Sequence, residues 1–180
     1  QPEPRLWWEA GPKAPWQPMR SQETRPAAIR NLILYPTNAL VEDQMTRLRR
    51  AVRSLGDGLP GRPLWFGRYT GVTLGTTRRP TKTNAIVDDV RRDLREATAE
   101  YNRLKDSDVD LAQFPDPRAH EMLVRWDMVE NPPDVLVTNY SMLNAMLMRE
   151  HEERMFQEAV ITTVGAARGR AGAAGRVSPR

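Results

Sequence analysis

Two stretches of the chain repeat the same order of a short apolar run, a polar turn and a helical pattern of apolar residues. In the first, residues 31–36 read Asn-Leu-Ile-Leu-Tyr-Pro, and residues 40–55 then place apolar side chains three or four positions apart. In the second, residues 134–138 form a β-branched run, and residues 142–156 carry a Met-rich apolar face. Strands that alternate with helices of this length predict an α/β fold with a parallel sheet.

The segment between these two units predicts one more strand and two helices. Residues 63–71 read as a strand that ends at Gly71, and a long helix follows from Thr83 or Asn84. That helix has one narrow apolar stripe, formed by Val87, Val90, Leu94, Ala97, Tyr101 and Leu104. The stripe favours packing on the domain surface, with a partner helix as the alternative. A short helix bearing Met122, Leu123 and Trp126 is expected before Pro132.

Residues 1–30 form a separate Pro/Trp-rich lead-in. They contain six of the 15 Pro and three of the five Trp of the chain. Pro at this density prevents helices and central strands. Two interpretations stay open: an extended segment that packs its Trp side chains on a neighbouring surface, and a disordered lead-in.

The last segment, residues 164–180, differs in composition from residues 31–163, which we take as the α/β unit. It is rich in Ala, Gly and Arg, and its four Arg account for the whole net charge of +4. The basic charge is therefore weak evidence that the folded part binds nucleic acid. We expect the native sequence to end near residues 159–163, with an out-of-frame continuation; a genuine flexible basic tail is the alternative.

No complete catalytic site is visible in the sequence. There is no Cys, and the two His, His120 and His151, lie far apart, which argues against a metal centre. A phosphate-binding loop of the form Gly-x4-Gly-Lys-Ser/Thr is missing, and so is a nucleophile elbow. The lack of Cys suits a reducing cytoplasm, and no apolar run is long enough for a transmembrane helix, so no membrane partner is expected.

Polar residues follow each of the three predicted strands. They are Pro36-Thr37-Asn38, Tyr69-Thr70-Gly71 and Thr138-Asn139-Tyr140. Ligands of open α/β sheets bind outside the carboxyl ends of strands, and helix N-termini there offer free N–H donors. Capping explains each group singly, but the three together favour a surface that holds a nucleic-acid backbone without reading its bases.

The same residues resemble motifs of superfamily 2 DEAD/DEAH-box helicases. Residues 34–44, Leu-Tyr-Pro-Thr-Asn-Ala-Leu-Val-Glu-Asp-Gln, resemble motif Ia, and residues 69–73, Tyr-Thr-Gly-Val-Thr, resemble the Tyr-x-Gly-Asp-Thr stretch that follows it. Residues 134–143, Asp-Val-Leu-Val-Thr-Asn-Tyr-Ser-Met-Leu, resemble the segment before the Walker B strand. Val72 stands where that family commonly has Asp.

The resemblance implies an incomplete RecA-like lobe of the P-loop NTPase type, with a parallel sheet and a helical insertion. It implies contacts to single-stranded nucleic acid, with DNA favoured over RNA, from eight residues: Pro36, Thr37, Asn38, Gln44, Thr70, Gly71, Thr138 and Asn139. It also implies ATP and Mg²⁺ as cofactors of a longer parent helicase, which would have a second helicase lobe.

The parts of that family that hydrolyse ATP have no counterpart in these residues. By the family's order, the phosphate loop is expected upstream of residue 1 and the acidic Walker B box near residue 160. The chain alone is therefore expected to bind no cofactor and to hydrolyse no ATP. The alternatives are a non-enzymatic α/β partner-binding module and a non-functional gene remnant.

Overall fold

The structure is a computed structural model that describes residues 6–11, 14–55, 63–81, 85–157 and 162–165. Its centre is a five-stranded, all-parallel sheet with the strand order β3-β2-β4-β1-β5. The strands are β1 (Asn31–Tyr35), β2 (Phe66–Tyr69), β3 (Glu121–Met122), β4 (Val135–Asn139) and β5 (Thr162–Gly165). The predicted α/β fold with a parallel sheet is confirmed, and the architecture is that of an incomplete RecA-like lobe.

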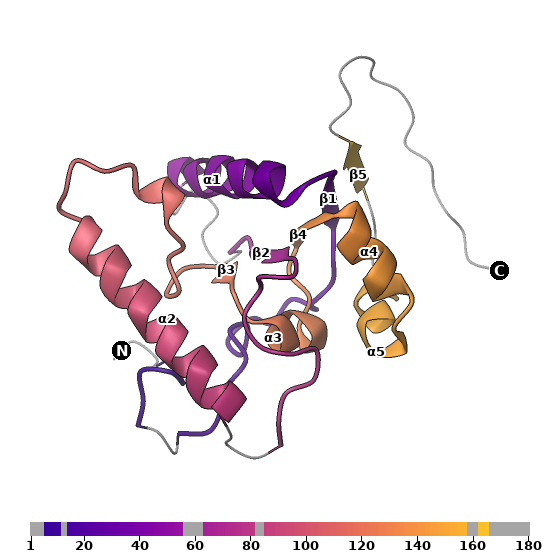
Figure 1. The fold of residues 1–180 in the computed structure, drawn as a ribbon, viewed down its shortest axis with the longest axis horizontal. Coiled ribbons are helices and arrows are strands. Elements are labelled where there is room, and N and C mark those ends of the chain that lie inside the picture. The colour runs from indigo at the N-terminus through magenta and orange to yellow at the C-terminus, as the bar shows by residue number, and fades with distance from the viewer. Residues whose placement is uncertain (1–5, 12–13, 56–62, 82–84, 158–161, 166–180) are drawn as a thin grey trace.

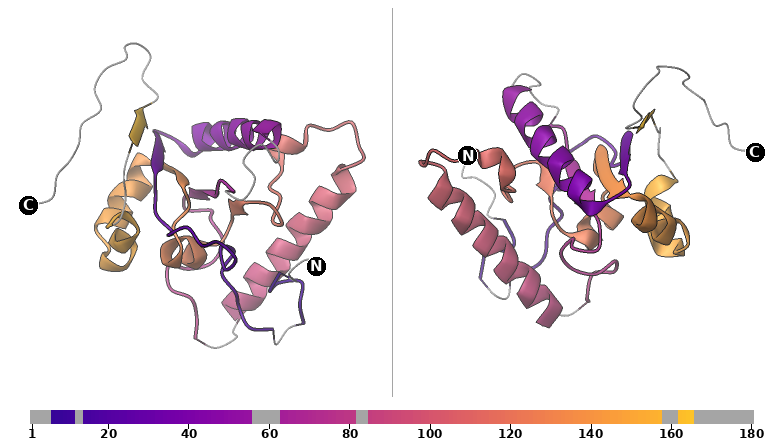
Figure 2. Two further views of the ribbon diagram at one scale, coloured as in Figure 1. Left: turned by 180° about the vertical axis from the view of Figure 1, so that it is seen from behind. Right: turned by 45° about the horizontal axis from the view of Figure 1, so that its top comes forward.

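Helices connect the strands, because parallel neighbours need a crossover between them. They are α1 (Asn38–Leu55), α2 (Ala85–Leu104), α3 (Arg125–Glu130), α4 (Tyr140–Leu147) and α5 (Glu150–Glu153), with short 3₁₀ turns at Leu111–Gln113 and Arg154–Phe156. Figure 1 shows α2 beyond the β3 edge of the sheet and α4 with α5 toward the β5 edge, and both views of Figure 2 agree.

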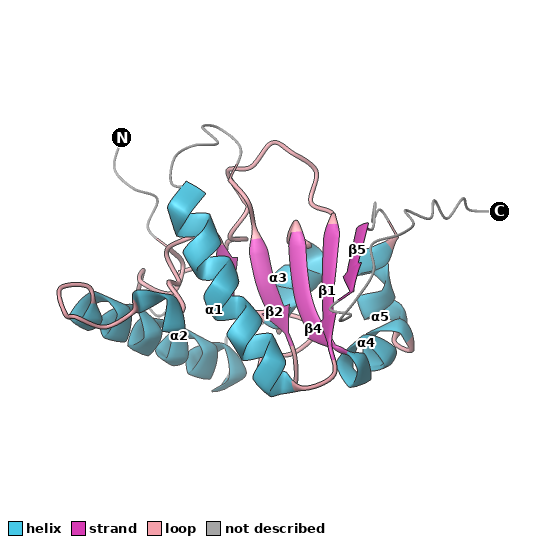
Figure 3. Cartoon of the chain, turned by 90° about the horizontal axis from the view of Figure 1, so that it is seen from above, coloured by secondary structure: helices cyan, strands magenta, loops and turns pink. Residues whose placement is uncertain are grey.

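Helix α1 covers one face of the sheet. Its buried Val41 and Met45 pack against Phe66, Val135 and Val137. Figure 3 shows α1 alongside β2. Side chains alternate between the two faces of a strand, so the neighbours of these residues point to the opposite face.

The opposite face is covered by α3, α4 and α5. The fully buried Leu136 and Tyr69 pack there with Met128, Met146 and Met155. Both faces of β4 are therefore inside the protein, and Val135, Leu136, Val137 and Thr138 are all buried. This explains why the run 135–138 lacks an apolar–polar alternation.

The region around residue 122 departs from the sequence prediction. Met122 belongs to strand β3, and the helix begins at Arg125, so the predicted helix over Met122, Leu123 and Trp126 is wrong in its first turn. Glu121 is 2% exposed and forms a two-pronged ion pair with Arg49 of α1, at 2.8 and 2.7 Å. This charge pairing compensates the buried carboxylate and lets a polar residue occupy the sheet.

The apolar stripe of α2 packs on the domain surface, as predicted. Val90 and Leu94 lie in a second cluster with Trp7, Trp8 and Trp126. Trp7 and Trp8 come from the amino-terminal segment and are 4% and 1% exposed. Of the two interpretations of this segment, its described residues therefore fit the one that packs Trp side chains on a neighbouring surface.

One carboxylate anchors the amino-terminal segment to the sheet. Asp134, at the start of β4, forms ion pairs with Arg25 at 2.6 Å and with Arg30, and Arg20 lies 4.0 Å away. The backbone N–H of Trp65 donates to the same carboxylate at 3.0 Å. Asp134 is 1% exposed, so these donors offset the cost of burying its charge.

The carboxyl end of the described chain adds an edge strand. β5 pairs with β1, and residues 162–164 lie beside residues 31–33. The strand reaches two residues into the segment 164–180, and residues 166–180 lie outside the described residues. No helix of the described chain combines the length and apolar character needed to cross a membrane.

Candidate functional site

The three strands with polar ends finish at one edge of the sheet, which we call the rim. Thr138 of β4 lies beside Leu34 of β1 on one side and beside Tyr69 of β2 on the other. Figure 3 shows these strands next to one another, with the starts of α1 and α4 near the same end. The parallel register therefore brings the three predicted polar groups together.

The end of β1 contributes the most exposed part of the rim. Pro36, Thr37 and Asn38 are all exposed, and α1 begins at Asn38. The Thr37 carbonyl accepts the hydrogen bond from the Val41 N–H at 3.3 Å, so the first helical turn starts directly at the rim. The first N–H groups of a helix have no partner within it, and they give this end a partial positive charge.

Asn139 connects the starts of the two helices. Its side-chain Nδ2 donates to Oδ1 of Asn38 at 2.6 Å, and its Oδ1 caps α4 by accepting from the Met142 N–H at 2.7 Å. The nitrogen and the oxygen of the Asn139 side-chain amide thus each contact the start of one helix. The positive ends of α1 and α4 are held next to each other on an exposed surface.

A tight turn after β2 forms the third part of the rim. The Thr73 N–H donates to the Thr70 carbonyl at 3.2 Å, and Thr73 Oγ1 accepts from the Thr70 N–H at 2.8 Å. Arg125 of α3 holds the turn from below by donating to the Thr70 carbonyl at 2.7 Å. Gly71 lies exposed at the tip, and a Cβ added there would meet no atom within 4 Å. Packing in this structure therefore gives no reason for a glycine at position 71.

Three of the eight residues implied by the resemblance point inward. Thr138 is fully buried and donates its hydroxyl to the Tyr69 carbonyl at 2.6 Å, so this hydroxyl joins β4 to β2. Gln44 is half-buried and accepts from the Tyr35 hydroxyl at 2.9 Å. Thr70 is 1% exposed, and its Oγ1 has no hydrogen-bond partner in the described part of the chain. The other five present the accessible surface of the rim.

A buried polar cluster supports the rim from the opposite face of the sheet. The Tyr69 hydroxyl donates to the carboxylate of Glu152, which is fully buried and also pairs with Arg149 at 3.0 Å. Burial, followed by the hydrogen bond to Glu152, raises the pKa of the Tyr69 phenol. The phenol therefore stays a donor and ties α5 to β2.

The described part of the chain holds no group of three His, Cys, Asp or Glu side chains arranged to hold a metal ion. The rim offers neutral amides, hydroxyls, backbone N–H groups and two helix starts instead. Such donors suit a phosphate backbone.

Comparison with known proteins gives one informative match. The chain is similar to Druantia protein DruE of Escherichia coli (strain UMEA 4076-1), with 30% identity over 175 residues. The match covers 72% of this chain and 10% of DruE, so the chain spans about a tenth of that relative. No protein-family model matches the chain.

Sequence reasoning missed Arg125 as the residue that fixes the turn of the rim. Arg125 also places its guanidinium 5.3 Å from the centre of the Tyr69 ring, so it contacts the last residue of β2 and the first residue of the turn. Its position directly before Trp126 carried no signal, because a charged residue at a helix start usually faces solvent. The pairing of Leu74 with Val124 brings it to the turn.

Proposed function

We propose that this chain is part of the first RecA-like lobe of an ATP-dependent DEAD/DEAH-box helicase, and that the rim binds the sugar–phosphate backbone of single-stranded nucleic acid. The observation that carries the proposal is the placement of Thr37, Asn38, Gly71 and Asn139 at one edge of the sheet. In the parent enzyme, ATP and Mg²⁺ would bind to parts outside these residues, and a second lobe would complete the strand-binding cleft.

The similarity to DruE supports this proposal in one respect. Because the match covers a tenth of DruE, a chain of this kind fits a role as one section of a much larger protein. The sequence motifs supply the helicase assignment, and the rim supplies a surface on which those motifs act together.

The rim also makes the sugar–phosphate backbone the expected ligand, while the preference for DNA over RNA comes from the resemblance alone. The rim's side-chain donors, the Thr37 hydroxyl and the amides of Asn38 and Asn139, lie beside two positive helix ends. None of the five accessible rim residues is an acid, so a phosphate meets no repulsion from them. Thr70 and Thr138 stabilise the rim from inside rather than touch the strand.

The decisive experiment replaces Asn38 by Asp. The new carboxylate keeps an oxygen that can accept from Asn139 Nδ2, and a negative charge at a helix start stabilises the helix by about 0.3–1 kcal/mol. The same charge repels phosphate. We therefore expect Asn38→Asp to leave stability equal or higher while it lowers affinity for a labelled single strand about fivefold or more in an anisotropy titration.

Asn102→Asp is the matched control. Asn102 is exposed on α2, away from the rim, so its replacement adds the same charge without adding it next to the strand. A second test uses Gly71→Ala, which this structure tolerates and which adds a methyl group where a bound strand would pass. If Asn38→Asp and Asn102→Asp bind the strand equally well, the rim is not the binding surface.

A competing function, a partner-binding module that uses the α2 stripe, has less support. Val90 and Leu94 of that stripe are already buried against Trp7, Trp8 and Trp126, so they are not available to a partner.

A further inference from the structure

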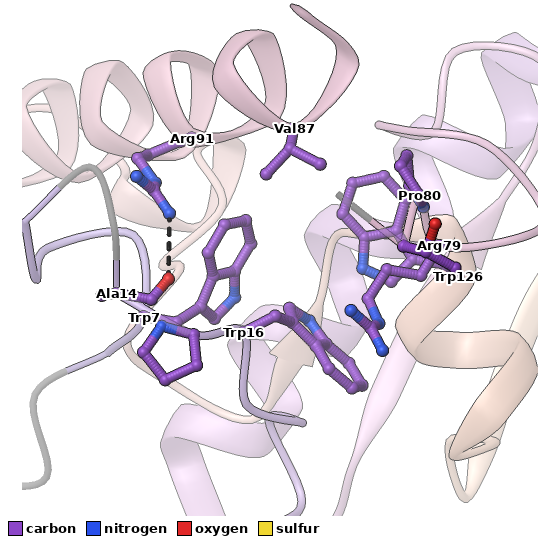
Figure 4. Close-up of a pocket in the computed structure, with 10 residues that line it drawn as sticks. Trp7, Ala14, Trp16, Arg79, Pro80, Val87, Arg91 and Trp126 are labelled. Atoms are coloured by element: carbon purple, nitrogen blue, oxygen red, sulfur yellow. Dashed lines mark hydrogen bonds between the residues drawn. The ribbon is translucent and has the colours of Figure 1, made fainter. Parts of the chain in front are cut away.

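A pocket lies between the amino-terminal segment, the loop after β2, α2 and α3. Its volume is about 360 Å³, and Trp7, Trp16 and Trp126 line it together with Arg79, Pro80 and Arg91. Figure 4 shows Trp7 and Trp126 on opposite sides of the hollow, with Val87 above and Trp16 below. We call it the tryptophan pocket. A volume near the lower end of the usual range for ligand sites suits a small molecule.

The charge of the tryptophan pocket is positive. Arg79 and Arg91 line it, and no Asp or Glu is among its lining residues. The Arg79 guanidinium lies 4.7 Å from the centre of the Trp16 ring, and its ion pair with Glu130 is long, at 4.0 Å. Arg91 is buried over the Trp7 ring at 5.4 Å, and its Nε has no partner in the described chain. The terminal nitrogens of Arg91 donate to the Gly11 and Ala14 carbonyls at 3.4 and 3.3 Å, so its spare donor is Nε. An anion that entered would find both cations.

The tryptophan pocket also holds unused donors on its aromatic walls. The indole N–H groups of Trp16 and Trp126 are buried and have no hydrogen-bond partner among the described residues. Trp126 is fully buried. A buried donor without a partner is costly, and its cost is relieved when a ligand brings an acceptor.

The Trp126 ring is fixed before any ligand arrives. Gly75 adopts a φ of 75° and lies against the ring so closely that a Cβ there would be 2.4 Å from Cζ3 and 2.7 Å from Cε3. These atoms are on the side of the indole away from its nitrogen. The loop therefore holds the ring by the edge away from its nitrogen, and a ring that is already fixed reduces the ordering cost of binding.

We propose that the tryptophan pocket binds a nucleotide, with its base against the indole rings and its phosphate near Arg79 and Arg91. A base has flat faces that stack on Trp and edge atoms that accept from indole N–H groups. A phosphate matches the guanidinium groups. An inorganic anion would leave the Trp rings unused, and an uncharged proline-rich peptide would leave the Arg residues unused.

The nucleotide has two possible sources, a free mononucleotide and one unit of a single strand. The loop that carries Arg79 begins at Thr70 and Gly71 on the rim, so one loop contributes residues to both the rim and the pocket. A nucleic-acid strand bound at the rim would lie on the same loop. The proposal does not depend on the function proposed for the rim, because a mononucleotide tests the pocket alone.

The test is a tryptophan-fluorescence titration of the whole chain. Deoxyadenosine monophosphate should quench the fluorescence saturably, and deoxyadenosine and deoxyribose 5-phosphate should each bind about tenfold more weakly. Arg79→Ala and Trp16→Leu should each weaken the mononucleotide about fivefold or more. Arg78→Ala is the matched control, since Arg78 is the exposed neighbour that does not line this pocket.

A short oligodeoxyadenylate distinguishes the two sources. Tighter binding of the oligonucleotide than of the mononucleotide, lost in Arg79→Ala, supports a strand unit; equal or weaker binding supports a free nucleotide. Circular dichroism checks that each variant is folded, which the exposure of Arg79 favours for Arg79→Ala, while Trp16 is half-buried. Absence of quenching, quenching unchanged by both variants, or quenching by a proline-rich peptide and not by the nucleotide would each overturn the proposal.

Discussion

Replacing Arg49 by Met is expected to cost this fold about 3–5 kcal/mol of unfolding free energy. Arg49 donates to Glu121 through Nε at 2.8 Å and through its terminal nitrogen at 2.7 Å, and also to the Ala112 carbonyl at 3.3 Å. Arg49 is 6% exposed and Glu121 2% exposed. Without the guanidinium, the carboxylate stays buried in the sheet without its hydrogen-bonded ion-pair partner.

The size of this loss matters because single domains are stable by only about 5–15 kcal/mol. The pair joins α1, which starts at the rim, to the edge strand β3, so its loss loosens one side of the sheet. The double variant Arg49→Met with Glu121→Leu removes both charges and fills a similar volume. It should recover most of the loss, because two apolar groups need no desolvated charge.

The assay is urea denaturation followed by circular dichroism, with Arg50→Met as the matched control. Arg50 is the next residue of α1 and pairs with Asp110 on the surface, where the two side chains are 57% and 39% exposed. Its replacement should change stability far less, because water screens an exposed pair. Equal losses in Arg49→Met and Arg50→Met, or a double variant as unstable as Arg49→Met alone, would refute the reasoning.

Two further predictions concern residues near the tryptophan pocket. Burial raises the pKa of Asp127 to about 7 from 3.8, so the folded state keeps a proton that the unfolded state releases. The stability from this group is therefore full below about pH 4 and falls, by on the order of 4 kcal/mol, as the pH rises through 7. Asp127→Asn should remove this loss, so that denaturation at about pH 8 shows a more stable variant; parallel pH profiles of both proteins would contradict it. Gly75→Ala should lower the thermal midpoint, with a cost of about 2 kcal/mol or more, because φ is 75° and the new Cβ would overlap Trp126; an unchanged midpoint would show that the loop is not held against the ring.

The sequence predicts the strand and the helix start of both units, because their signals are local. The single helical face expected from Met142 to Phe156 is wrong, because the chain breaks after Leu147 into α4, α5 and a 3₁₀ turn, and Leu147 is exposed. The apolar run before Pro36 and the helical spacing of Val41 and Met45 need no knowledge of the rest of the chain. The order of the strands in the sheet then follows from pairing that only the structure shows. The rim was predicted as a set of strand ends, and the parallel register brings these ends to one edge.

The features that the sequence did not predict depend on distant partners. Strand β3 is two residues long, and its Glu121 is acceptable in the sheet only because Arg49 lies opposite it. Thr138 has the same appearance in the sequence as Thr37, yet its hydroxyl is used by the neighbouring strand β2. Trp16 and Trp126 are 110 positions apart, so no local pattern reveals that they share a pocket.

The carboxylate of Asp134 also sets an order of events during folding. The guanidinium groups that it holds belong to residues 20, 25 and 30, more than a hundred positions earlier in the chain. Contacts of such high sequence separation form slowly, because a long loop must close before they contribute. The amino-terminal segment therefore docks only after β4 is in place, and the pocket that this segment lines is among the last parts of the molecule to be assembled.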